Sequence, residues 1–94
     1  MIEVKRETGL NGLVRLDGDI LEIFGFKREY SLRIHVNQIS CVSLGKVRRS
    51  GSGEMELNLE IRYDTYIGQA FFEAGKIKPL EELVDLLSKK IISH

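Results

Sequence analysis

The hydrophobic residues of this chain change their spacing once, and that change limits the folds that the chain can adopt. In residues 54–63 an apolar side chain stands at every second position. From Pro79 onward the apolar residues are three and four positions apart. A period of two matches a strand with one buried face, whereas spacings of three and four match one face of an α-helix. The sequence therefore predicts a β-rich body followed by a C-terminal helix.

The strand signals are spread over the first three quarters of the chain. Residues 54–63 and 30–36 alternate apolar with polar side chains, and residues 39–47 form a third, more continuous strand segment. Asp17-Gly18-Asp19 lies between two apolar runs, and glycine accepts the positive φ that tight hairpin turns require. Further turns are predicted at 25–28, 37–38 and 64–65. Together with a first strand over 2–7, these segments predict about seven antiparallel strands.

The C-terminal segment reads as an amphipathic helix with matching charges at its ends. Its apolar stripe consists of Leu80, Leu83, Val84, Leu87 and Ile91. Pro79 suits the first helical position, and Glu81 and Glu82 are predicted near the positive end of the helix dipole. Asp85 and Lys89 form an i,i+4 pair in the favourable order. We expect this helix to cover one open end of the curled sheets.

Length and composition restrict the class of protein. A chain of 94 residues, 43% of them hydrophobic and 30% charged, is expected to form one folded domain over 1–94. Fourteen basic and fourteen acidic residues give zero net charge, which argues against a nucleic-acid partner. One cysteine allows no intrachain disulfide, and neither a signal peptide nor a membrane span is recognisable. A cytoplasmic location is the expectation.

The order of the segments resembles a known superfold. Strand and turn segments lead to Ile-His-Val-Asn-Gln-Ile-Ser-Cys-Val at 34–42, then a loop, strands at 55–63 and 66–72, and the helix Pro-Leu-Glu-Glu-Leu-Val-Asp-Leu-Leu. This order is similar to the pleckstrin-homology-like superfold, above all to its small bacterial versions. The resemblance implies two roughly orthogonal antiparallel sheets, a partly open barrel, with the helix over one corner. It also implies a non-enzymatic module that binds phosphoinositides, peptides or proteins, or that oligomerises as a scaffold.

Two basic segments are candidates for binding an anionic ligand or a membrane surface. Phosphoinositide-binding members of the superfold carry a basic motif after the first core strand, but residues 9–12 contain no base and 17–19 are acidic. The candidate ligand-binding residues elsewhere are Lys27, Arg28, Lys46, Arg48 and Arg49. The alternative is that both segments are solvated loops, with Phe26 folded onto the barrel. The sequence leaves open whether the two segments converge.

No residue pattern predicts an enzyme, a cofactor or a metal. His35 alternates onto the polar side of its strand, where a surface role is the simpler interpretation. Cys41 lies in the apolar strand segment, so we expect a buried and inert thiol. Two distant histidines and one cysteine do not provide the three or four donors of a metal site.

The segment 66–72 is the candidate for contact with a partner. It contains no charged residue, unlike the charged outer face of 54–63, and an uncharged edge strand invites pairing. The alternative is that 66–72 is an interior strand. Phe26 and Tyr66 are the predicted partner contacts. The functional prediction is a non-catalytic module that binds a protein or a second copy of itself, with anionic-ligand or membrane-surface binding as the alternative.

Overall fold

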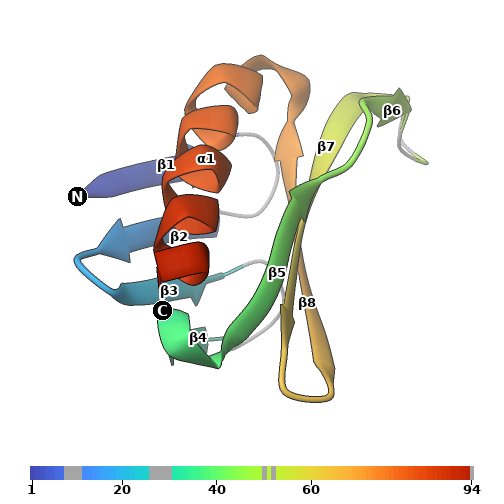
Figure 1. Cartoon of the computed structure of the whole chain (residues 1–94). Coiled ribbons are helices and arrows are strands. Elements are labelled where there is room, and N and C mark those ends of the chain that lie inside the picture. The colour runs from blue at the N-terminus through green and yellow to red at the C-terminus, as the bar shows by residue number, and fades with distance from the viewer. Residues whose placement is uncertain (8–11, 26–30, 50, 52, 94) are drawn as a thin grey trace.

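The computed structural model describes residues 1–7, 12–25, 31–49, 51 and 53–93, and these form two antiparallel sheets of four strands each. The first sheet holds, in spatial order, β1 (Ile2–Arg6), β2 (Gly12–Asp17), β3 (Ile20–Phe24) and β4 (Ser31–His35). The second holds β5 (Ile39–Leu44), β6 (Arg48–Arg49), β7 (Met55–Tyr63) and β8 (Tyr66–Glu73). The strands of the first sheet run across those of the second (Figure 1).

The described residues also form two short 3₁₀ helices and one α-helix. η1 (Val36–Gln38) joins the two sheets, η2 (Ala74–Lys76) follows β8, and α1 (Ile77–Ser93) ends the described chain. α1 packs against β5 and also contacts η1, η2 and β1 (Figure 1). The predicted class, a mainly β fold with one C-terminal helix, is therefore confirmed.

The strand count differs from the prediction because the segment 39–47 does not form one strand. Among the described residues there are eight strands rather than about seven, and the additional one is the two-residue β6. β5 and β6 lie along the same side of β7, with residues 45–47 between them. The Gly45 N–H donates a 2.8 Å hydrogen bond to the Asn58 carbonyl, which keeps the intervening backbone against β7.

Two tight turns join neighbouring strands in the two sheets. Asp17 pairs with Ile20 across a two-residue loop in which Gly18 has φ +59°, as the Asp-Gly signal predicted. Tyr63 pairs with Tyr66 across a second two-residue loop in which Asp64 has φ +50°. Aspartate tolerates this left-handed conformation better than most residues. Each turn fixes the register of its hairpin.

One hydrophobic core lies between the sheets and the helix. The buried side chains are Val4, Val14, Leu16, Leu21, Ile23, Ile34, Val36, Ile39, Leu57, Leu59, Ile61, Ala70, Phe72, Leu80, Leu83 and Leu87. In β7 the predicted alternation is confirmed for Leu57, Leu59 and Ile61, which are at most 1% exposed. Met55 is 44% exposed at the start of the same strand.

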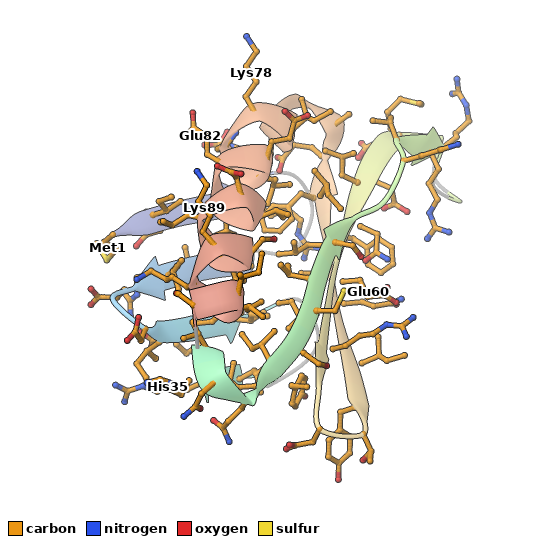
Figure 2. All side chains as sticks on the ribbon, viewed as in Figure 1. Met1, His35, Glu60, Lys78, Glu82 and Lys89 are labelled. Carbon is orange, nitrogen blue, oxygen red and sulfur yellow. The ribbon has the colours of Figure 1, made fainter. Side chains whose placement is uncertain are left out.

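The helix presents the predicted stripe to this core. Leu80, Leu83 and Leu87 are fully buried, while Val84 and Ile91 are half-buried against the core. Figure 2 shows Glu82 and Lys89 on the side of α1 away from the second sheet, and Lys78 pointing upward from the start of the helix. The amphipathic pattern therefore decides how α1 docks.

The start of the helix corrects a detail of the prediction. α1 begins at Ile77, so Pro79 is its third residue rather than its first. The third position still lies in the first turn, where a missing N–H costs no intrahelical hydrogen bond. Glu81 and Glu82 consequently lie beyond the first turn, which contains no acidic residue. The predicted pair is present, with Lys89 Nζ 3.0 Å from Asp85 Oδ2.

A bulge in β5 overturns the expectation that Cys41 is buried. Ile39 pairs with Tyr63 but Cys41 pairs with Arg62, so Ser40 is an extra residue in the ladder. One extra residue exchanges the faces of every side chain that follows. Cys41 is therefore exposed on the outer face.

The same bulge returns the rest of β5 to the core. Beyond it, Val42 and Leu44 pack against the core, three and five positions after the buried Ile39. The Ser40 hydroxyl donates a 3.0 Å hydrogen bond to the Arg62 carbonyl, which holds the bulge in place.

Candidate interaction surface

β8 is an edge strand in the part of the chain that the structure describes, where it pairs with β7 alone. The alternative, an interior strand, is therefore not what the described residues form. Tyr63 and Tyr66 close a two-residue hairpin loop, and such a closing pair exchanges both of its backbone hydrogen bonds. Pairs alternate along an antiparallel ladder, so the N–H and C=O groups of Ile67, Gln69 and Phe71 point away from β7.

Two hydrogen bonds mark where this edge stops being free. Arg6 Nη1 donates to the Phe71 carbonyl at 3.2 Å, which agrees with that carbonyl facing away from β7. The Glu7 N–H donates to Glu73 Oε2 at 2.9 Å. The end of β1 thus reaches the C-terminal end of β8, while none of the described strands pairs with the outer side of β8 before Phe71.

The β8 edge differs from the other strand edges in charge and in cover. Charged residues occur on each of the other edges except β5: Glu3, Lys5 and Arg6 on β1, Arg33 on β4, and Arg48 and Arg49 on β6. β5 carries no charge but has α1 packed against it. β8 has no charged residue before Glu73. Edge strands of monomeric proteins usually carry a charge, a proline or a cover.

The N-terminal end of β8 also exposes apolar surface. Tyr66 is 64% exposed and Ile67 is 55% exposed. The Tyr66 ring lies 5.8 Å from the Tyr63 ring, centroid to centroid, across the turn. Figure 1 shows this hairpin turn projecting past the rest of the molecule at the bottom of the view. The predicted contact residue Tyr66 therefore lies on an accessible, partly apolar projection.

The outer face of the second sheet is polar and internally paired. Arg48 Nε lies 3.4 Å from Glu56 Oε1, and its Cζ lies 5.2 Å from the centre of the Phe71 ring. Arg62 Nε lies 3.9 Å from Glu60 Oε2. Glu60 projects from β7 on the side away from α1 (Figure 2). The candidate ligand residue Arg48 is therefore already engaged by a carboxylate and an aromatic ring.

The other predicted basic residues are only partly described. Lys46 and Arg49 are exposed, and Arg49 Nη1 donates a 2.9 Å hydrogen bond to the Gly53 carbonyl. The predicted residues Phe26, Lys27 and Arg28 lie outside the described residues. The structure therefore does not test whether the two basic segments converge.

A pocket of about 400 Å³ lies at one end of the first sheet, and the sequence analysis missed it. Its lining residues are Lys5, Arg6, Gly12, Leu13, Phe24 and Gly25. Lys5 and Arg6 supply its positive charge, although Lys5 Nζ also lies 3.7 Å from Glu3 Oε1. The predicted run of consecutive antiparallel strands could have indicated it, because the first and third strands of such a run end on the same side of the sheet.

His35 has a structural role. The His35 Nδ1 atom accepts a 3.1 Å hydrogen bond from the Asn37 backbone N–H, and the His35 backbone N–H donates one of 3.1 Å to Gln38 Oε1. These two bonds form a capping box at the start of η1. In the described ranges, no three His, Cys, Asp or Glu side chains gather as they would around a metal ion.

No comparison with a known protein assigns a function to this chain, so its function is inferred from its geometry. The described part of the chain contains no helix with both the length and the apolar character needed to cross a membrane. No protein-family model, no curated protein and no solved structure matches this chain.

Proposed function

We propose that this chain is a non-catalytic interaction module of the pleckstrin-homology-like type that binds a protein strand or its own copy through β8. The observation that carries the proposal is an uncharged edge strand with exposed Tyr66 and Ile67 at its start. The assignment to this superfold is supported by two crossed antiparallel sheets with a C-terminal helix packed on β5.

Binding would occur by addition of a strand to the second sheet. The outward N–H and C=O groups of Ile67 and Gln69 supply main-chain hydrogen bonds to an extended segment. Tyr66 and Ile67 supply apolar area, which is the main source of affinity in such contacts. The charged pairs on the outer face fix the orientation of the partner rather than its affinity.

The proposal is tested by combining light scattering with affinity capture from a lysate of the source organism. The chain with Tyr66→Ser and Ile67→Lys should lose at least about tenfold in captured partner or in self-association, because both apolar contacts are removed. Ile92→Lys is the matched control, since Ile92 is an 85% exposed apolar residue at the end of α1. The proposed function requires that the wild type self-associates or captures a protein, and that the double variant loses this binding. If neither kind of binding is seen, or if the double variant keeps it, the proposed function is wrong.

A second candidate function, binding of an anionic ligand or membrane surface, is supported by the pocket beside Lys5 and Arg6. The segment that contains Lys27 and Arg28 follows the lining residue Gly25 in sequence. Co-sedimentation with acidic and neutral liposomes at two salt concentrations tests it, with Lys5→Glu as the variant. Binding should favour acidic liposomes, weaken with salt and fall in the variant. Equal binding to both liposomes would exclude this function.

A further inference from the structure

We infer that the partner of β8 is a second copy of this chain, paired antiparallel with its own β8 about a twofold axis at Gln69. This inference rests on the proposed function, in which β8 is the binding edge, and it names the partner and the register. The second sheet of one copy would then join the second sheet of the other copy into one continuous sheet across the dimer. The inference is carried by three properties of β8: its outward backbone groups, its side-chain order and its lack of charge.

The backbone groups of β8 fit this register. Ile67, Gln69 and Phe71 direct their N–H and C=O groups away from β7. With the axis at Gln69, the two Gln69 residues face each other, and Ile67 faces Phe71 of the second copy. Both kinds of pair thus consist of residues from the outward set. Such pairs exchange both backbone bonds in an antiparallel ladder, so the pairing satisfies the open groups of both copies.

The hydrogen bond from Arg6 is compatible with this arrangement. Arg6 Nη1 occupies one acceptor position of the Phe71 carbonyl at 3.2 Å. A carbonyl oxygen has two lone pairs, so it can also accept the Ile67 N–H of the second copy. The N–H and C=O groups of Ile67 and Gln69 have no backbone partner on this side among the described residues.

The side chains on the outer face match in the same register. Ile67, which is 55% exposed, would face the Phe71 ring, and an aliphatic–aromatic pair across strands is favourable. The two Gln69 side chains would face each other, and amides are both donors and acceptors. No charged residue of one copy faces a like charge of the other within 66–72. A strand of arbitrary sequence would not meet all of these conditions.

The other edges do not offer the same self-pairing. β1, β4 and β6 carry charged residues, and β5 has α1 packed against it. Charged side chains on an edge strand discourage its pairing with another chain. The dimer should therefore use β8 alone and stop at two copies, because a twofold contact uses the same edge of both molecules.

The charge-swap experiment uses the full chain and measures its mass by size-exclusion chromatography with light scattering over a range of concentrations. The mass of the wild type should rise from 10.7 kDa toward twice that value. Gln69→Lys and Gln69→Glu should each weaken the dimer about fivefold or more, because two like charges then face each other at the axis. An equimolar mixture of the two variants should restore association. Ser43→Lys is the matched control, since Ser43 lies exposed on β5 of the same sheet and away from the axis.

A covalent test reports the register without adding charge. In an antiparallel hydrogen-bonded pair the two Cα atoms are about 5.5 Å apart, which a disulfide can span. Gln69→Cys in a Cys41→Ser background should give a disulfide-linked dimer with oxidised glutathione as the oxidant. Ser43→Cys in the same background should form no disulfide-linked dimer, because Ser43 lies on β5, away from the axis.

The outcomes separate this inference from the proposed function. A wild-type chain that stays at 10.7 kDa at every concentration overturns the inference. Dimers that persist unchanged in both Gln69 charge variants, or mixtures that do not restore association, overturn the register. A monomer that still captures a protein through Tyr66 and Ile67 leaves the proposed function standing with a different partner.

Discussion

The two long edges of the second sheet, β5 and β8, differ in how they are protected from pairing with another chain. β5 is bulged at Ser40 and has α1 packed against it. β8 pairs with β7 in unbroken register from Tyr66 to Glu73 and has no helix packed along it among the described residues. Bulges and covers are the usual means of preventing a strand edge from pairing with another chain.

This difference is the reason for proposing β8 as the edge that contacts a partner. Among the described residues, the other edges are protected by charge, by a bulge or by the helix, whereas β8 has an unbroken register and no charge before Glu73. An exposed edge of this kind has a cost in solubility, which is offset when a partner covers it. The following predictions either break the protection of β5 or sharpen the contrast with β8.

The largest expected effect comes from weakening the cover of β5. Leu83→Ala removes a fully buried side chain from the docked face of α1 and should lower the free energy of unfolding by about 3 kcal/mol. Urea denaturation followed by circular dichroism measures the loss. Ile92→Ala, at an 85% exposed position, should change stability by less than about 0.5 kcal/mol. Equal losses in the two variants would mean that α1 is not docked by this stripe.

A lysine scan of adjacent β5 positions tests the bulge. Val42 packs against the core, so Val42→Lys should cost about 2 kcal/mol for placing a charge there. Cys41 is exposed, so Cys41→Lys should cost less than about 0.5 kcal/mol. The same urea titration measures both. The reverse order of stability would place Cys41 on the inner face and remove the bulge.

The polar outer face should contribute a smaller amount. Arg48→Ala removes both the ion pair with Glu56 and the contact with the Phe71 ring, and should cost about 1 kcal/mol. Arg49→Ala is the matched control, because among the described residues the Arg49 side chain makes only an exposed hydrogen bond to the Gly53 carbonyl. High salt should reduce the difference between the two variants. No difference at low salt would argue against the Arg48 contacts.

The smallest effect on stability is expected at β8 itself. Ile67→Lys changes an exposed edge residue and should alter the free energy of unfolding by less than about 0.5 kcal/mol. Thermal denaturation at a dilute, monomeric concentration measures this. A loss above 1 kcal/mol would mean that Ile67 stabilises the monomer, and β8 would then be protected like β5.

The sequence predicted the regular parts of the fold because their periodicity is unbroken. β7 alternates without interruption, and α1 keeps its spacing of three and four from Leu80 to Ile91. In such segments, once one side chain is known to face the core, the repeat determines which of the remaining side chains face the core and which face solvent. The uncharged segment 66–72 was likewise visible as a candidate edge.

Other features depend on which strands become neighbours. The exposure of Cys41 follows from one extra residue in β5, which is defined only by its pairing with β7. The pocket lined by Lys5 and Arg6 exists because the ends of β1 and β3 flank the start of β2 at one end of the sheet. Both features depend on residues that are distant from one another in the sequence.

Hydrophobic spacing alone determined that this chain forms curled strands followed by a docked helix, because burial rewards a repeat that runs along one segment. The tertiary structure decided which edges are covered and which is open, because an edge is a relation between strands distant in sequence. That β8 pairs on one side alone among the described residues is therefore a property of the assembled sheet, although its lack of charge is visible in the seven residues 66–72.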